Sequence, residues 1–231
     1  MKNAILMAAG MGTRMRPLTE KMPKPLVPVV GKPMIETVID AMTGIGIDHI
    51  YIVTGYLGEQ FEYLKEKYSN ITLLNNPDYE TVNNISSMFS ALDVLRKGTC
   101  FICEADLYIS DSSFLYREPD KSGYYGRYVE GHSDDWVFER DQEGYITRVG
   151  KVGDNCYNMV GVAYFKEKEA SILADKIEEA YGAPGYETMF WDDVVNKNLQ
   201  ELELVVHPVT EDMIVEIDTV QELEEVEKRF A

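Results

Sequence analysis

The stretch Ala4-Ile5-Leu6-Met7-Ala8-Ala9-Gly10-Met11-Gly12-Thr13-Arg14 decides the expected fold of this chain. Its first four residues are apolar and predict a buried strand. Small residues and two glycines follow, and their backbone N–H groups are able to surround a polyphosphate. Four cations come within the next turns: Arg14, Arg16, Lys21 and Lys24. The stretch therefore predicts a strand that ends in an anion-binding loop.

The charge of the chain is distributed unevenly. Its 231 residues include 22 Lys and Arg against 40 Asp and Glu, which gives a formal net charge of −18. The first 35 residues hold six of the cations and a single acid, Glu20. One basic segment in an acidic protein favours a small anionic ligand over a long nucleic acid. We therefore expect no nucleic-acid partner.

Length and composition limit the class of protein. A chain of 231 residues, 45% of them hydrophobic, is able to bury a sizeable core as a single domain. No apolar run approaches the roughly 20 residues that span a bilayer, and the N-terminus lacks the features of a signal peptide. Cys100 and Cys103 have C-x-x-C spacing, but on a strand they point to opposite faces, which favours core packing. We expect a cytoplasmic protein without membrane insertion.

Strands and helices are predicted to alternate in the first half of the chain. Apolar runs predict strands at 49–54, 71–74 and 99–105, and amphipathic segments predict helices at 33–42, 59–68 and 85–96. This alternation favours a parallel sheet with helices on both faces. Later segments predict helices at 166–181, 188–198 and from 220, and strands at 202–206 and 214–217. We expect an α/β, Rossmann-like, mostly parallel sheet, with a small antiparallel extension made of short β runs at about 123–165.

Two common glycine loops do not fit the first stretch. A Walker A loop requires Gly-Lys-Ser/Thr, whereas Gly12 is followed by Thr13 and Arg14. A Rossmann dinucleotide loop requires a third small residue at the position of Met15. A different phosphate-binding fold is therefore expected.

The segment resembles the signature of the sugar-nucleotidyltransferase-like superfamily, which is an apolar strand, A-A-G-x-G-x-R-x-x-P-L-T and then P-K. The chain has each of these elements between Ala8 and Lys24. Ala105-Asp106 and Glu216-Ile217-Asp218-Thr219 are similar to the two segments that carry the metal-binding aspartates of this family. Gly150-Lys151-Val152 is similar to the segment with its acceptor-phosphate lysine. The resemblance covers almost the whole chain.

This resemblance implies a reaction and roles for four residues. An oxygen of an acceptor phosphate would attack the α-phosphorus of a nucleoside triphosphate and expel pyrophosphate. Two anions must meet, so the catalytic groups are expected to be cations and metal ligands. The implied catalytic residues are Arg14, for the leaving pyrophosphate, and Lys24, for the α-phosphate. Asp106 and Asp218 would bind Mg²⁺.

Four further features carry a narrower resemblance: Gly55-Tyr56-Leu57, Asn83-Asn84, Asp135-Trp136 and Trp191-Asp192. In these the chain most resembles, within the superfamily, the small cytidylyltransferases that activate phosphocholine and related head groups. The implied partners are CTP and a small phosphorylated or phosphonate amine. The implied nucleotide contacts are Ala8, Ala9, Gly10, Gly12, Thr81, Asn83 and Ala105. The implied acceptor contacts are Ser86, Ser87, Asp135, Trp136, Lys151, Trp191, Asp192 and Glu216. The resemblance also suggests that cytosine and ribose bind near Gly10 and Asn83.

The cationic end of the acceptor remains open at this stage. A quaternary ammonium favours aromatic faces such as those of Trp136 and Trp191. A primary ammonium favours carboxylates and hydroxyls. Ser86 and Ser87 depart from the more aromatic character usual in phosphocholine enzymes at this place and resemble the related enzymes that activate 2-aminoethylphosphonate. Acids also lie beside both tryptophans, so 2-aminoethylphosphonate is favoured over phosphocholine. For Tyr186 and Phe190 we favour ordinary packing.

The same residues allow other interpretations. Asp106 could only cap a turn, Asp218 could cap the last helix, and Lys151 could be a solvated loop residue. The chain could instead be a sugar-1-phosphate nucleotidyltransferase or a non-catalytic, nucleotide-binding regulatory module. The oligomeric state, including a homodimer, and fusion to a partner domain are left open.

Overall fold

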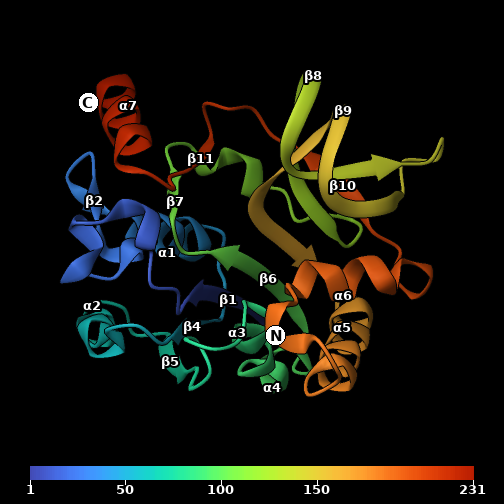
Figure 1. Cartoon of the computed structure of the whole chain (residues 1–231), viewed down its shortest axis with the longest axis horizontal. Coiled ribbons are helices and arrows are strands. Elements are labelled where there is room, and N and C mark those ends of the chain that lie inside the picture. Colours follow the sequence, from blue (N-terminus) through green and yellow to red (C-terminus); the bar gives the residue numbers. More distant parts are fainter.

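The computed structural model describes residues 1–231, and a seven-stranded mixed sheet runs through it in the order β10-β8-β9-β6-β1-β4-β5 (Figure 1). Its strands are β1 (Lys2–Ala8), β4 (His49–Thr54), β5 (Ile71–Asn75), β6 (Thr99–Glu104), β8 (Gly123–Arg140), β9 (Ile146–Phe165) and β10 (Val205–Pro208). β1 pairs in parallel with both β4 and β6, and β9 pairs antiparallel with β6 and β8. The predicted mostly parallel sheet is confirmed.

Helices cover both faces of this sheet. They are α1 (Met34–Gly44), α2 (Tyr63–Lys67), α3 (Ile85–Phe89), α4 (Leu92–Leu95), α5 (Glu167–Ala180), α6 (Trp191–Lys197) and α7 (Val220–Phe230). Residues of α1 and α2 belong to one core cluster, whereas α3, α4, α5 and α6 contribute to the cluster on the opposite face. This two-sided covering explains why the central strands are apolar runs without alternation.

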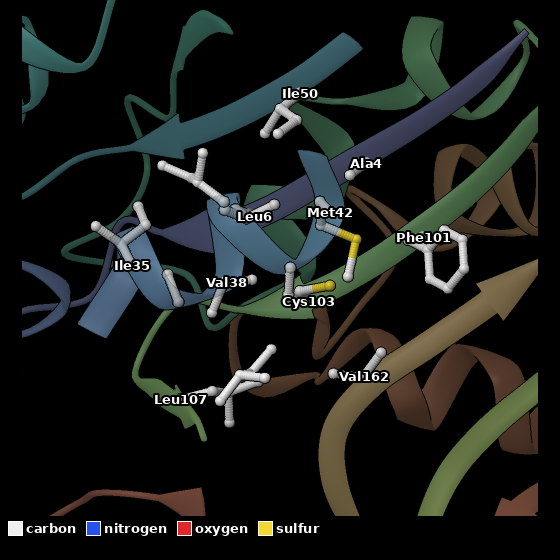
Figure 2. Close-up of a cluster of buried hydrophobic side chains, with 14 of the residues drawn as sticks. Ala4, Leu6, Ile35, Val38, Met42, Ile50, Phe101, Cys103, Leu107 and Val162 are labelled. Carbon is white, nitrogen blue, oxygen red and sulfur yellow. The ribbon is translucent and has the colours of Figure 1, made fainter. Parts of the chain in front are cut away.

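β1 illustrates how one strand serves both cores. Ala4 and Leu6 belong to the cluster under α1, where Figure 2 places them beside Val38 and Met42. Ile5 belongs to the cluster on the other face. Cys103 and Cys100 of β6 divide in the same way, and both thiols are free and buried. The prediction that these cysteines are core residues is confirmed.

Two small sheets stand beside the main one. β7 (Leu107–Ile109) pairs antiparallel with β11 (Ile214–Glu216), and β2 (Pro28–Val29) pairs with β3 (Lys32–Pro33). The β7–β11 pair places Leu107 opposite Glu216, so the segments that carry Asp106 and Asp218 become neighbours. This pairing joins the middle of the chain to its C-terminal part at the end of β6.

Four predicted elements differ from the structure, and one of them is the strand expected at 202–206, which is β10 at Val205–Pro208. The helix expected at 59–68 is a 3-10 turn, Gly58–Phe61, followed by the short α2. The helix expected at 85–96 is divided into α3 and α4 at Ala91, whose φ of −112° and ψ of 13° leave the helical region, so that its N–H donates to the carbonyl of Met88 (3.0 Å) three residues back. The helix expected at 188–198 begins only at Trp191.

The second half of the sheet is also simpler than predicted. The short runs expected at 123–165 are two long strands, β8 and β9, paired along most of their length. Register shifts between them accommodate the Gly and Asp residues that suggested breaks. In Figure 1 the two strands extend away from the helices α5 and α6.

None of the helices combines the length and the apolar character that a membrane span requires. The single domain and the cytoplasmic location stay predictions.

Candidate active site

Two adjoining cavities lie beyond the carboxyl end of β1. The first has a volume of about 470 Å³ and is lined by the glycine loop, and the second has a volume of about 580 Å³ and is lined by β8 and β9. Five residues line both cavities: Arg14, Asn84, Glu104, Glu216 and Asp218. A position at the carboxyl ends of parallel strands is expected for a ligand site in an α/β fold. The shared residues mark the place where ligands of the two cavities would meet.

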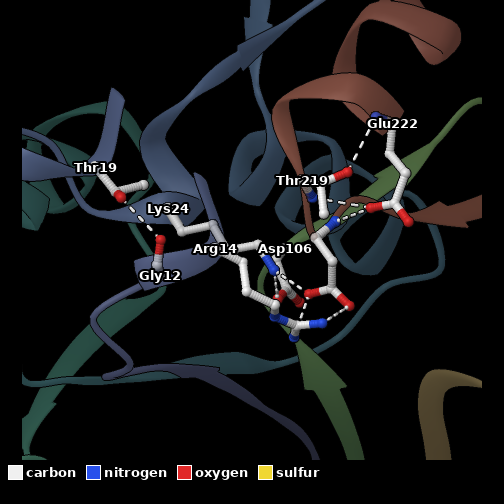
Figure 3. Close-up of polar contacts among 8 residues, drawn as sticks. Gly12, Arg14, Thr19, Lys24, Asp106, Thr219 and Glu222 are labelled. Atoms are coloured by element: carbon white, nitrogen blue, oxygen red, sulfur yellow. Dashed lines mark hydrogen bonds and ion pairs between the residues drawn. The ribbon is translucent and has the colours of Figure 1, made fainter. Parts of the chain in front are cut away.

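The glycine loop brings Lys24 into the first cavity. Gly12 has a φ of +60°, and the hydroxyl of Thr19 donates to its carbonyl at 2.8 Å (Figure 3). A Cβ on Gly12 would lie 2.6 Å from the Cβ of Lys24. A glycine is therefore required here both by the left-handed backbone and by the close approach of the lysine.

Lys24 stands between two aspartates. Its Nζ lies 2.5 Å from Oδ2 of Asp106 and 2.6 Å from Oδ1 of Asp218, and its side chain is only 8% exposed. Burial lowers the pKa of Lys24, but the two carboxylates outweigh burial, and the pKa is raised above its usual value. Arg14 contacts the same Asp218 through both Nη atoms at 2.6 Å (Figure 3). Asp218 thus holds the two predicted catalytic cations together.

The start of α7 positions Asp218. The backbone N–H groups of Asp218 and Thr219 donate to Oε2 of Glu222 at 2.7 and 2.8 Å. The N–H of Glu222 donates in turn to the hydroxyl of Thr219 at 3.2 Å. This is a capping box with Thr219 as the N-cap. The interpretation of Asp218 as the cap is therefore wrong, and its carboxylate lines the cavity, where it pairs with Arg14 and Lys24.

A carboxylate cluster lies beside these residues. Oxygens of Glu104, Asp106 and Glu216 all lie within 4.8 Å of one another. Oxygen ligands of this kind suit a divalent cation. Burial and then the charges of Glu216 and Asp106 raise the pKa of Glu104 well above its usual value. Although Glu216 is exposed as a residue, its carboxylate lines the cavity, and desolvation of this carboxylate together with the charges of Asp106 and Asp218 raises its pKa to about 8. A bound cation would relieve this repulsion.

The predicted nucleotide contacts fall into two groups. Ala8, Ala9, Gly10, Gly12 and Asn83 line the first cavity. Thr81 does not line either cavity, because its exposed hydroxyl turns toward the carbonyl of Asp78 (3.5 Å). Ala105 is fully buried in the core under α1, while its neighbours Glu104 and Asp106 face the cavity.

The predicted acceptor contacts also divide. Five of them line the second cavity: Asp135, Trp136, Lys151, Asp192 and Glu216. Ser87 lines the first cavity instead. Ser86 lines neither, because its buried hydroxyl donates to the carbonyl of Asn83 at 2.8 Å and accepts from the side chain of Asn76 at 2.9 Å. It stabilises the turn into α3 and is not placed for an acceptor.

Trp191 is a core residue. It is 3% exposed and stacks on Tyr124, with ring centroids 5.5 Å apart. The first turn of α6 directs this ring toward the sheet, so it does not line the second cavity. Phe190, for which packing was favoured, lines that cavity beside Trp136, with ring centroids 5.3 Å apart. The aromatic pair of the cavity is therefore Trp136 and Phe190.

Sequence reasoning missed several residues that line the site. They are Asn84, Glu104, Arg127, Asp134, Asn158 and Phe190. Glu104 had a usable signal, because it is an acid at the end of an apolar strand, directly before Ala105-Asp106. The positions of Asn158 and Phe190 depend on the pairing of β8 with β9 and on the docking of α6. No local sequence pattern predicts that these two residues line the cavity.

Asp192 is expected to make folding stability depend on pH. It is 3% exposed, and burial raises its pKa from 3.8 to about 7, although the hydroxyl of Tyr124 donates to it at 3.0 Å. The unfolded chain ionises at lower pH, so the stability of the native state falls as the pH rises from about 4 to about 7. The Asp192→Asn variant lacks this titration. As the pH rises from about 4 to about 7, its free energy of unfolding should therefore increase by about 4 kcal/mol relative to that of the wild type. Thermal melting between pH 4 and 8 measures the difference.

The exposed Asp120 offers a matched control for this prediction. Asp120→Asn should change the melting temperature by the same small amount at every pH. A constant difference between Asp192→Asn and the wild type across the range would contradict the buried, protonated state of Asp192.

Comparisons with known proteins agree with this geometry. Residues 3–118 match the family model described as Nucleotidyl transferase. The chain belongs to this nucleotidyl transferase family. It is 52% identical to a 2-aminoethylphosphonate cytidylyltransferase of Lancefieldella rimae over 96% of this chain and 90% of that protein. It is 32% identical to a choline-phosphate cytidylyltransferase of Streptococcus pneumoniae, covering 97% and 96% of the two chains.

Solved structures extend the comparison. A CTP:phosphocholine cytidylyltransferase from Streptococcus pneumoniae superimposes with a TM-score of 0.91 at 33% identity, covering 100% of this chain and 99% of that one. A putative glucose-1-phosphate thymidylyltransferase from Bacillus anthracis shares only 16% identity at a TM-score of 0.80, covering 99% and 95% of the two chains, and this shows the common fold. The predicted nucleotidyltransferase of the cytidylyltransferase type is confirmed by these relatives.

Proposed function

We propose that this nucleotidyltransferase transfers CMP from CTP to 2-aminoethylphosphonate and releases pyrophosphate. The observation that carries the proposal is the 52% identity to a relative of that name across nearly the whole chain. The second cavity suits the acceptor chemically. It combines Lys151, a partner for the phosphonate, with acids that suit a primary ammonium, among them Asp134 and Asp135.

The reaction brings two anions together, so charge neutralisation and in-line positioning supply most of the catalysis. Arg14, which lines both cavities, binds the β- and γ-phosphates and stabilises the departing pyrophosphate. Lys24 neutralises the charge that develops at the α-phosphate. The acceptor oxygen is already ionised at neutral pH, and no side chain is required as a general base.

Asp106 and Asp218 are proposed as the Mg²⁺ ligands. Their oxygens converge on one ammonium, that of Lys24, so the cavity already gathers carboxylates around a cation. Glu104 and Glu216 lie close enough to Asp106 to contribute directly or through water. When bound, Mg²⁺ screens the phosphate charges and favours the leaving pyrophosphate. These four carboxylates, all of which line the first cavity, would hold the cation there.

A phosphocholine acceptor is the second candidate. Trp136 and Phe190 line the second cavity, and aromatic faces attract a quaternary ammonium. Two relatives named as choline-phosphate cytidylyltransferases share 32% and 28% identity with this chain. A sugar-1-phosphate has less support, because the relevant structures share the fold at low identity.

Pyrophosphate release with CTP and Mg²⁺ tests the proposal. The acceptors to compare are 2-aminoethylphosphonate, phosphocholine and glucose-1-phosphate, each at matched concentration. We expect the highest kcat/KM with 2-aminoethylphosphonate. A preference for phosphocholine would identify the second candidate, and turnover with the sugar phosphate alone would assign the chain to a different branch of the family. No pyrophosphate release with any acceptor would support a regulatory module.

A further inference from the structure

Lys151 lies against the two aromatic rings of the second cavity. Its Nζ is 5.6 Å from the ring centroid of Trp136 and 5.3 Å from that of Phe190. Both distances are within the range of cation–π attraction. The position that a cationic ligand would take beside these rings is therefore already held by an ammonium of the chain itself.

Three features of the fold restrain the positions of Lys151, Trp136 and Phe190. Trp136 and Lys151 are cross-strand partners in the pairing of β8 with β9. Arg148 donates to the carbonyls of Lys151 (3.2 Å) and Val152 (2.7 Å), which restrains the backbone that carries the lysine. Phe190 is restrained as well, because its N–H donates to the carboxylate of Asp193 at 2.8 Å.

The surroundings of Lys151 are strongly acidic, yet it is not paired with an acid. The second cavity is lined by Glu104, Asp134, Asp135, Asp192, Glu216, Asp218 and Glu222. Its two other cations are paired, Arg14 with Asp218 and Arg127 with Glu211 (3.7 Å). The ion pairs of the molecule do not include Lys151. An aromatic surface attracts an ammonium without neutralising it, whereas a carboxylate would have to be displaced by an incoming anion.

We propose that Trp136 and Phe190 are positioning residues that hold the ammonium of Lys151 for the anionic end of the acceptor. The rings do not enclose the cationic end, which is left to the acids of the cavity. A quaternary ammonium would have to displace Lys151 from the rings, so the arrangement favours a primary amine. The inference rests on the proposed function in taking the acceptor as a phosphonate or phosphate monoester.

Competitive inhibition by an analogue of the acceptor that lacks the amine tests this inference. Ethylphosphonate has the phosphonate of 2-aminoethylphosphonate but no ammonium, and its competitive Ki is measured beside the KM of the acceptor. Phe190→Leu and Trp136→Leu should each raise both constants by the same factor, about 2- to 30-fold. In the Lys151→Met background the same substitutions should add little, because the group that the rings hold is gone.

Several outcomes would overturn the inference. If KM rises while the Ki of ethylphosphonate is unchanged, the rings contact the amine of the acceptor. If neither constant changes, the rings do not position Lys151. Tyr128→Leu, an exposed aromatic of β8 outside both cavities, is the matched control, and melting temperatures confirm folding of each variant. If only phosphocholine is turned over, the proposed acceptor is wrong and the inferred preference for a primary amine falls with it. The same comparison with ethyl phosphate in place of ethylphosphonate then decides whether the rings still position Lys151.

Discussion

Asp106→Asn is expected to reduce turnover by about a thousand-fold or more while the fold is kept. Asp106 lies between β6 and β7, contacts Nζ of Lys24 at 2.5 Å and belongs to the carboxylate cluster with Glu104 and Glu216. An amide has nearly the same shape but no charge, so it weakens both the cation site and the ion pair. Removing one of several close negative charges also relieves repulsion, and the melting temperature should not fall.

Two measurements check this prediction. Pyrophosphate release reports the loss of turnover, and thermal melting with and without MgCl₂ reports the cation site in the absence of chemistry. A ligand that binds only the folded state stabilises it. Mg²⁺ should therefore raise the melting temperature of the wild type, and it should raise that of Asp106→Asn much less. Asp111→Asn is a matched control, because this exposed residue caps a turn after β7 and lies outside both cavities. Near-normal turnover in Asp106→Asn would remove Asp106 from the site.

Lys24→Met is expected to lower kcat by about 10²- to 10⁴-fold, with a smaller change in the KM for CTP. The ammonium is nearly buried and opposes the charges of Asp106 and Asp218, so it is well placed to meet the negative charge of the transition state. Methionine keeps most of the side-chain volume, which preserves the packing against Gly12. The effect should therefore be electrostatic.

A second measurement tests whether Lys24 competes with Mg²⁺ for the carboxylates of Asp106 and Asp218. In the free protein the ammonium occupies the space between two proposed Mg²⁺ ligands. Without it, Asp106 and Asp218 repel each other, and the melting temperature of Lys24→Met should rise more with added MgCl₂ than that of the wild type. Lys21→Met, in the same loop but exposed and outside both cavities, is the control. Unchanged kinetics in Lys24→Met would exclude its catalytic role.

The sequence was most informative where function depends on consecutive residues. The strand, two glycines and the cations that follow it occupy one short segment, so the loop around Gly12 and the identity of Lys24 could be predicted without tertiary contacts. Asp106 was predictable for the same reason, since it follows an apolar strand whose end must lie at the edge of the sheet. These features also determined the fold class and the family.

The rotational orientation of a helix and the register of a strand pair could not be predicted from local sequence patterns. Trp191 and Phe190 are adjacent in sequence, yet docking of α6 buries the first against Tyr124 and turns the second into the cavity. Ser86 and Ser87 separate in the same way at the start of α3. A hydrophobic pattern states that one face of a segment is buried, but it does not state which neighbouring element covers that face.

The sequence by itself therefore determined the kind of protein this is, a nucleotidyltransferase, and it predicted the glycine loop with its two cations and the two aspartates. Only the tertiary structure decided which acids cluster at the candidate site, and that Lys151 lies against Trp136 and Phe190. The physical reason is distance along the chain. Glu104 and Glu216 meet through the β7–β11 pairing, and such long-range contacts depend on the packing of the whole chain and not on any local pattern.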